Sequence, residues 1–123
     1  MEKGLTFTST DVVRVENLAK TIGSGDLEVL ATPAMAALME NAAMRAVAPE
    51  LPEGSTTVGS FLEITHARPT GLGETISATA TLEEVEGRKL TFLVEAFDSK
   101  GVIGEGKHVR YVVDRQKFIS KLG

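Results

Sequence analysis

The apolar residues between positions 33 and 48 follow one another too closely to leave a polar face on a helix. The segment reads PAMAALMENAAMRAVA, in which Glu40 and Arg45 are the only charged residues. A helix that is apolar on all sides belongs inside a fold. The pattern therefore predicts a long, almost wholly buried helix that ends before the turn-rich sequence PELPEG. Thr32 is its expected N-cap and Pro33 its first residue, where the missing N–H costs nothing.

Downstream of this helix the pattern changes to stretches rich in Val, Ile, Thr and Phe. The sequences between them, ARPTGLGE, EGR and DSKG, have the composition of turns, and the last two are short enough for tight hairpins. Apolar side chains alternate over residues 90–97, as in an antiparallel strand with one buried face and one half-solvated face. The predicted strands span residues 56–65, 75–85, 89–97 and 102–113.

The two ends of the chain add smaller elements. Residues 5–15 alternate irregularly and predict one more strand, followed by a short helical turn over 16–21. The sequence GSGD at 23–26 has the composition of a loop. At the other end, residues 114–122 (DRQKFISKL) predict a short amphipathic helix that packs its apolar side chains, which are Phe118, Ile119 and Leu122.

One long apolar helix combined with antiparallel strands is an α+β layout, and the helix must lie against one face of the sheet. The 123 residues suffice for one domain with a core. Seven alanines in the helix suit a sheet that curls closely around it. We therefore expect a single hot-dog domain over residues 1–123, in which a curved antiparallel sheet of five or six strands wraps one long central helix.

Composition and charge narrow the classes of function. The chain is 42% hydrophobic and 24% charged, with a net charge of -4 and no basic run, which argues against a nucleic-acid surface. Without cysteine there is no disulfide, thiolate nucleophile or cysteine metal site, and two histidines without clustered acids argue against any metal centre. The chain shows no secretory signal and no apolar run long enough to span a membrane. We expect a cytoplasmic protein.

Glu40 lies in the middle of the apolar helix, where an isolated charge costs on the order of several kcal/mol. Such a carboxylate must be paired, hydrogen-bonded or protonated. From the residues alone, two interpretations of Glu40 are equally supported. Glu40 is either a structural carboxylate, which pairs with a neighbour such as Arg45 or has its burial cost reduced by a dimer interface, or a catalytic carboxylate. Thr32 and His66 supply a hydroxyl and an imidazole, which acid–base or nucleophilic chemistry combines with a carboxylate.

Other candidate residues also have simple structural explanations. Besides capping the helix, the Thr32 hydroxyl lies at the positive end of the helix dipole, where it can hold an oxyanion. His66 near a strand end is typical of a surface or capping residue. Gly59 inside a strand indicates either a bulge or a backbone N–H offered to a ligand. His108 and Arg110 point the same way from one strand, and we expect them on a solvated or interface face.

Several segments, in order and nearly without gaps from about residue 28 to the C-terminus, resemble one known family. That family is the hot-dog acyl-CoA thioesterases of the fluoroacetyl-CoA thioesterase-like group. The resemblance lies in EVLAT at 28–32, LME at 38–40, RAVAP at 45–49, the stretch from Gly59 to Thr65-His66 with the later Pro69 and Gly71, VEGRKL at 85–90, GKHVR at 106–110 and Lys117-Phe118.

The resemblance implies hydrolysis of a small acyl-CoA thioester to the free acid and coenzyme A, without a cofactor or metal. Matched residue by residue, the family's catalytic threonine, glutamate and histidine are Thr32, Glu40 and His66, and its glycine near the thioester carbonyl is Gly59. Whether Glu40 is nucleophile or general base stays open. Arg68 is a candidate for contact with the coenzyme A phosphates, against a reading as solvated turn charge.

One departure from the family's pattern concerns selectivity. Aromatic residues ahead of the helix form a lid in the fluoroacetyl-selective pattern, whereas residues 23–27 here read GSGDL. We therefore expect thioester hydrolysis without fluoroacetyl selectivity. The alternative is a non-catalytic hot-dog module that binds an acyl or other small apolar ligand, because the altered lid encloses a substrate poorly. A hydratase is disfavoured by the spacing of Thr32 and Glu40.

The family resemblance also implies a homodimer, with side-by-side domains and active sites at the interface. An edge strand that needs covering gives an independent physical reason for a dimer. Glu40 and His66 could then come from different chains. The expected partners are the acyl-CoA substrate and a second copy of this chain, with no nucleic acid and no membrane.

Overall fold

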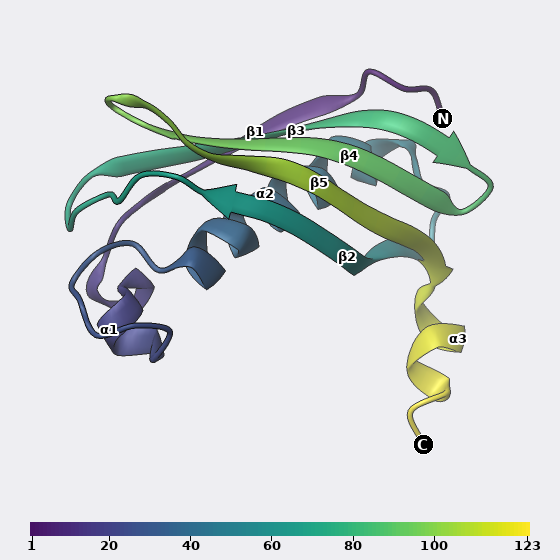
Figure 1. Ribbon diagram of the computed structural model, residues 1–123. Helices are drawn as coiled ribbons and strands as arrows, with labels where there is room; N and C mark the ends of the chain where they lie inside the picture. Colours follow the sequence, from purple (N-terminus) through teal and green to yellow (C-terminus); the bar gives the residue numbers. More distant parts are fainter.

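The computed structural model describes all residues from 1 to 123 and contains one antiparallel sheet wrapped around one long helix (Figure 1). The sheet has five strands in the order β1-β3-β4-β5-β2, and every neighbouring pair is antiparallel. The predicted α+β hot-dog architecture is confirmed, with five strands. The strands are β1 (Thr6–Val12), β2 (Ser55–His66), β3 (Thr75–Glu86), β4 (Lys89–Asp98) and β5 (Gly101–Asp114); the helices are α1 (Ala19–Ile22), α2 (Thr32–Val47) and α3 (Arg115–Ser120), with 3-10 turns η1 (Val15–Asn17) and η2 (Ala48–Glu50).

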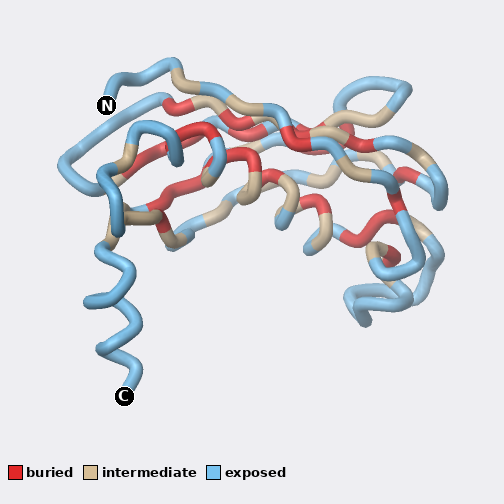
Figure 2. Tube along the Cα trace, turned by 180° about the vertical axis from the view of Figure 1, so that it is seen from behind, coloured by how far each residue is buried: buried red, intermediate tan, exposed pale blue.

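The core lies between α2 and the concave face of the sheet. In Figure 2 the buried positions follow the inner face of α2 and alternate along the central strands. The alternation predicted for β4 is confirmed, since its apolar residues at 90, 92, 94 and 96 are all buried. The helix approaches the sheet closely: a β-carbon at Gly104 would lie 2.7 Å from the Met35 sulfur. None of the helices has both the length and the apolar character needed to cross a bilayer.

α2 packs mainly against β1 and β3, and touches β4 and β2 less. This offset corrects the prediction of an almost wholly buried helix. Thr32, Ala37 and Arg45 are exposed, and Glu40 is only half-buried. The exposed guanidinium of Arg45 lies 4.6 Å from the centre of the Phe7 ring. The side of α2 that faces β2 and β5 is therefore left partly uncovered. Thr32 and Glu40 lie along it, whereas Asn41 and Arg45 contact residues of β1.

The start of α2 differs by one residue from the prediction. Ala31 is the N-cap, and its carbonyl accepts hydrogen bonds from the N–H groups of Ala34 and Met35. Thr32 is the first helical residue and Pro33 the second, so Thr32 does not cap the helix. Its hydroxyl is hydrogen-bonded elsewhere, which releases it for the site described below.

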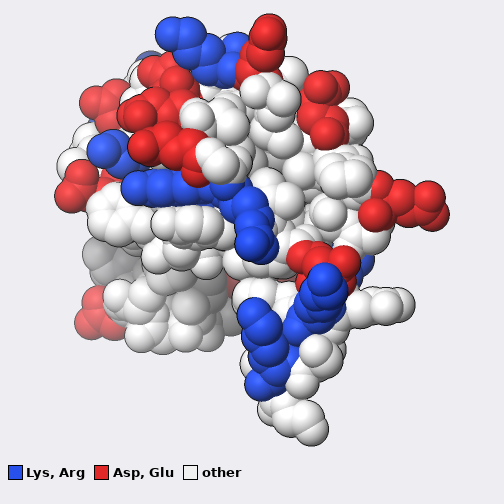
Figure 3. All heavy atoms as spheres, turned by 90° about the vertical axis from the view of Figure 1, so that its right-hand side faces the viewer, with Lys and Arg blue, Asp and Glu red and all other residues white.

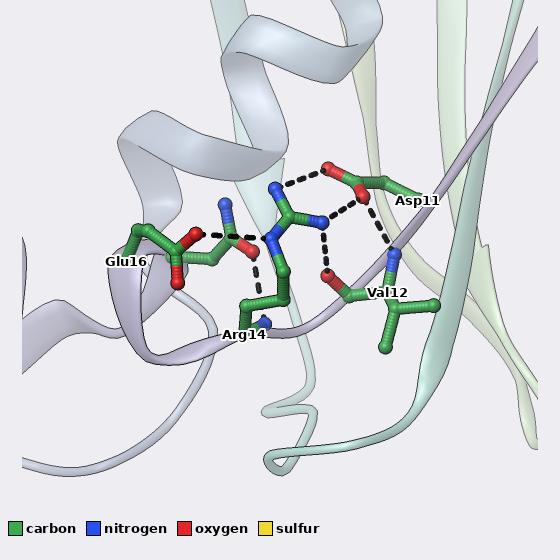
Figure 4. A network of polar contacts seen from close by, with 5 residues as sticks. Asp11, Val12, Arg14 and Glu16 are labelled. Carbon is green, nitrogen blue, oxygen red and sulfur yellow. Dashed lines mark hydrogen bonds and ion pairs between the residues drawn. The ribbon is translucent and has the colours of Figure 1, made fainter.

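β1 ends at Val12, three residues earlier than predicted, because a polar network turns the chain (Figure 4). The Arg14 side chain donates to Asp11 Oδ1 at 2.5 Å and to Glu16 Oε2 at 3.2 Å, while the Arg14 backbone N–H donates to Asn17 Oδ1 at 2.9 Å. The hydrogen bond from Arg14 is the largest cause that lowers the pKa of Asp11. These contacts stop the strand and start the 3-10 turn η1.

The C-terminal helix forms as predicted, but it does not pack its apolar residues. It projects from the end of β5 away from the sheet, and every residue from 114 to 123 is exposed (Figures 1 and 2). The exposed fractions of Phe118, Ile119 and Leu122 are 37%, 63% and 77%. The helix makes only a small contact with β5, so most of its apolar surface stays uncovered within the protomer.

Candidate active site

Two polar clusters lie between α2 and the edge strand β2, one near each end of the strand. The first, called here the imidazole cluster, is Thr32 and His66. The second, called here the carboxylate cluster, is Glu40, Gly59, His108 and Arg110.

The imidazole cluster joins the first residue of α2 to the last residue of β2. Thr32 Oγ1 and His66 Nδ1 are hydrogen-bonded at 2.7 Å. His66 Nε2 is buried and has no hydrogen-bond partner, which is rare because almost all buried polar atoms are paired. Burial lowers the pKa of His66, and the backbone of Arg68 acts in the opposite direction. A neutral imidazole with one free nitrogen can accept or return a proton.

The His66 side chain opens into a pocket formed by α1, the segment before α2 and the turn after β2. Its lining includes Ala19, Ser24, Val29, Thr32 and Pro69. Residues 21–28, of which Ser24 lines this pocket, are all exposed. They contain no aromatic side chain that closes over it.

The carboxylate cluster is built around Gly59 on β2. Three groups converge on the place where a side chain at this position would begin. A β-carbon there would lie 3.0 Å from Glu40 Oε2, 3.2 Å from His108 Cε1 and 3.4 Å from Arg110 Nη1. Only glycine leaves this space open, and the strand has a bulge between Gly59 and Phe61. The bulge, one of the two explanations given for Gly59, is thus present, and a backbone N–H offered to a ligand stays a prediction.

The Glu40 carboxylate faces this opening without a partner of its own. It makes no ion pair and no side-chain hydrogen bond, although it is half-buried. The structural reading of Glu40 as an ion-pair partner of Arg45 is therefore wrong, since that guanidinium lies over the Phe7 ring. The depression in front of the carboxylate is open to solvent and is lined by α2 and by Val58, Gly59 and Arg110.

His108 and Arg110 are buried, so the expectation of a solvated or interface face is wrong. The exposed fractions are 0% for His108 and 7% for Arg110. Arg110 donates from Nε to Thr57 Oγ1 at 2.8 Å, from Nη2 to Thr57 O at 2.9 Å and from Nη1 to His108 Nε2 at 3.2 Å. His108 Nδ1 donates to Phe61 O at 2.8 Å. These bonds fix His108 as the neutral tautomer with its proton on Nδ1.

The carboxylate cluster holds a buried positive charge, on Arg110, that is not hydrogen-bonded to any carboxylate. Burial is the main cause that lowers the pKa values of His108 and Arg110, and the nearby Glu40 charge raises both. The guanidinium is held only by neutral acceptors, namely Thr57 and the ring of His108. Its positive charge is therefore available to anything that binds at the Gly59 backbone, where a developing oxyanion would be stabilised.

The two clusters do not meet within one protomer. Thr32 and Glu40 are eight positions apart on α2, which is about 12 Å along the helix axis. The pocket beside His66 and the depression before Glu40 share no lining residue. The structure thus brings Thr32 together with His66, and Glu40 together with Gly59, but separates the two pairs.

Arg68 lies in the wall of the His66 pocket, and its guanidinium is engaged. Nη2 donates to Asp98 Oδ1 at 2.9 Å, and the side chain also contacts the carbonyls of Gly101 and Val102. Thr70 Oγ1 donates to the same carboxylate at 2.9 Å. Burial alone would raise the pKa of Asp98, but the hydrogen bonds from the Lys100 backbone, Arg68 and Thr70 outweigh it and lower that pKa. This network holds the turn after β2 in place.

No group of three or more His, Asp or Glu side chains is placed to hold a metal ion. The two clusters offer a carboxylate, a hydroxyl, an imidazole and a strand backbone beside a buried arginine. Those groups suit attack on a carbonyl carbon and stabilisation of the resulting oxyanion.

Comparison with known proteins gives consistent matches. A family model described as fluoroacetyl-CoA-specific thioesterase matches residues 13–116. The fluoroacetyl-CoA thioesterase of Streptantibioticus cattleyicolor is 43% identical over 95 residues, which cover 77% of this chain and 68% of that protein.

Solved structures agree with the sequence matches. A structure of the fluoroacetyl-CoA thioesterase FlK superposes with a TM-score of 0.92 at 37% identity, covering 99% of this chain and 95% of that one. A structure of an FlK variant in complex with fluoroacetate and CoA gives 0.90 at 37% identity, covering 96% and 99%. A thioesterase superfamily member from Thermus thermophilus gives 0.90 at 27% identity, covering 98% and 90%.

Proposed function

Since this chain belongs to the fluoroacetyl-CoA-specific thioesterase family, we propose that it hydrolyses small acyl-CoA thioesters to the free acid and coenzyme A. The observation that carries the proposal is the unpartnered Glu40 carboxylate facing Gly59 beside the buried Arg110 guanidinium. A half-buried carboxylate without a structural partner, next to an open strand backbone, is what hydrolysis of a thioester needs.

The working site is completed by a second copy of the chain. β2 is an edge strand, and both clusters lie along it. If two β2 strands pair antiparallel about a point near Glu63, the bulge at Gly59 of one protomer lies opposite the partner's His66. The carboxylate cluster of each protomer then meets the imidazole cluster of the other. A homodimer with two shared sites also covers the exposed edge strand.

In this dimer the residues act on one thioester from two sides. Glu40 attacks the carbonyl carbon or takes a proton from the water that attacks it. The Gly59 backbone N–H, with the Arg110 charge behind it, and the partner's Thr32 hydroxyl stabilise the oxyanion. The tetrahedral intermediate collapses by breaking the carbon–sulfur bond. When Glu40 acts as the base, this releases the free acid; when Glu40 attacks, it leaves an acyl anhydride on Glu40 that a water molecule then hydrolyses. In both cases the proton given up by the water reaches the leaving thiolate, with the partner's His66 as the relay.

Arg68 keeps a secondary place in the proposal. Its side chain lines the pocket beside His66, where it can face the coenzyme A portion of a substrate. Because the guanidinium is engaged by Asp98, its main effect is to hold that wall in position. The proposed location is the cytoplasm.

A free-thiol release assay over a panel of acyl-CoA substrates tests the proposed function. We expect release from at least one short or aromatic acyl-CoA. If no substrate gives release above background at high enzyme concentration, the chain is a non-catalytic module that binds an acyl or other small apolar ligand. The exposed, aromatic-free segment 21–28 is the feature that favours this second reading.

A further inference from the structure

We propose that α3 of one protomer covers the segment Ile22 to Glu28 of its partner and acts as a lid in trans over the imidazole cluster. The lid proposal rests on the proposed dimer. The contact would bury the uncovered apolar face of α3 and would close the open pocket beside His66. The occupant is a second copy of this chain.

α3 and the segment 22–28 lie at opposite ends of β2. α3 follows β5 at Asp114, which pairs with Ser55, the first residue of β2. The segment 22–28 lies at the other end, since Ser24 and His66 line the same pocket. Figure 1 shows α1 and α3 below the sheet, on the helix side, at opposite ends. Antiparallel pairing of two β2 strands brings the start of one to the end of the other, and so brings α3 to the partner's segment 22–28.

Apolar surface is the second argument. Ile119 and Leu122 at the C-terminal end are exposed by 63% and 77%, and Leu27 in the other segment by 67%. Once the two ends meet in the dimer, the exposed apolar residues of one end can bury those of the other. Phe118, also exposed, then supplies an aromatic ring near a segment that has none.

Charge is the third argument. Residues 115–122 carry Arg115, Lys117 and Lys121 and no acidic residue, whereas residues 22–28 carry Asp26 and Glu28 and no basic residue. Figure 3 views the molecule from the α3 end, where Lys and Arg side chains gather on the projecting helix. Opposite charges on the two segments set the orientation of the contact.

α3 is held firmly enough to serve as such a lid. The Arg115 N–H donates to Gly54 O at 3.0 Å, which ties the start of the helix to the chain before β2. The Asp114 side chain accepts from the Lys117 N–H at 3.0 Å and caps the helix. The first turn thus fixes the direction of the helix, while Ile119 and Leu122 stay largely exposed.

The absence of cysteine from the chain allows a direct test by site-specific cross-linking. The double variant Leu27→Cys, Ile119→Cys is treated with a short bismaleimide and run on a denaturing gel. We expect most of the protein at twice the monomer mass, because the two positions of one protomer lie at opposite ends. The control is Leu93→Cys, Ile119→Cys, which places the first cysteine on an exposed strand position of β4 outside the proposed contact; it should stay largely uncross-linked.

Analytical ultracentrifugation of the same samples distinguishes the absence of the lid contact from the absence of the dimer. A dimer that cross-links equally poorly in both variants overturns the lid and leaves the dimer standing. A monomer at the working concentration overturns the lid together with the proposed dimer. Thiol release by the unmodified chain is measured separately, so failure of the proposed function is recognised on its own.

Discussion

At the scale of single residues, the site is defined by the two polar groups that lack partners. Arg45, Arg68 and Arg110 are each engaged, by an aromatic ring, a carboxylate and a threonine. In contrast, the Glu40 carboxylate and His66 Nε2 are free. An unpaired polar atom inside a fold is costly, as at His66 Nε2. The Glu40 carboxylate instead opens to solvent without a partner. Under the proposed function both groups act on the substrate.

Gly59 gives a prediction at this scale. The variant Gly59→Ala places a β-carbon 3.0 Å from Glu40 Oε2, so the flexible carboxylate has to move aside. We expect turnover to fall by about 10- to 100-fold, because small misplacements of reacting groups are costly. The melting temperature should change little. The control is Gly71→Ala, where a β-carbon meets nothing within 4 Å. Equal activity of the two variants would contradict the role given to Gly59.

The residue scale also shows where sequence reasoning reaches its limit. Glu40 was identifiable because it interrupts an apolar helix, and Gly59 because it interrupts a strand. His108 and Arg110 were misplaced, because a strand face that carries an imidazole and a guanidinium is typical of a solvated or interface face. The register between β5 and β4 determines which face these side chains occupy, because His108 lies opposite Phe92 on the concave side of the sheet. That pairing is not encoded in β5 itself.

At the scale of elements, most boundaries followed from local chemistry. β2, β3, β4 and β5 agree with the predicted ranges to within one residue at each end, because turn sequences delimit them. β1 ended early at the Arg14 network, which depends on side chains meeting in three dimensions. α3 formed as its pattern indicates, but no pattern within one chain reveals that its partner surface is missing from its own domain.

The segment before α2 carries the prediction on substrate selectivity. Residues 23–27 are exposed and without aromatic side chains. We therefore expect a preference for fluoroacetyl-CoA over acetyl-CoA well below about 100-fold, which corresponds to roughly 2.7 kcal/mol of differential transition-state binding. The measurement is kcat/KM for both substrates under identical conditions. A preference above that level would mean that selectivity arises without an aromatic lid in this segment.

At the scale of the whole molecule, two histidines with lowered pKa values link stability to pH. Burial is the main cause for both His66 and His108. The folded chain therefore binds fewer protons than the unfolded chain once the pH falls below about 6.5, the value of a free histidine. Stability is full above that pH and is lost as the pH drops toward the folded-state pKa values.

The expected result is a melting temperature that declines steadily between pH 7 and pH 5. Asp11 and Asp98, whose pKa values are lowered, add a further loss of the same sign below about pH 4. The variant His108→Asn serves as a comparison and should show a shallower decline above pH 5. A melting temperature that stays constant or rises on acidification would contradict the burial of neutral imidazoles in the folded chain.

The central claim, that Glu40 performs the chemistry, is tested most directly by thiol release and thermal melting on one sample of Glu40→Gln. The amide keeps the size of the side chain but can neither attack nor take a proton. We expect turnover to fall at least ~100-fold, with the melting temperature nearly unchanged, because no ion pair or side-chain hydrogen bond is lost. The control Glu50→Gln, at an exposed carboxylate after α2, should keep full activity. Retained turnover in a less stable Glu40→Gln protein would contradict the account and make Glu40 a structural residue.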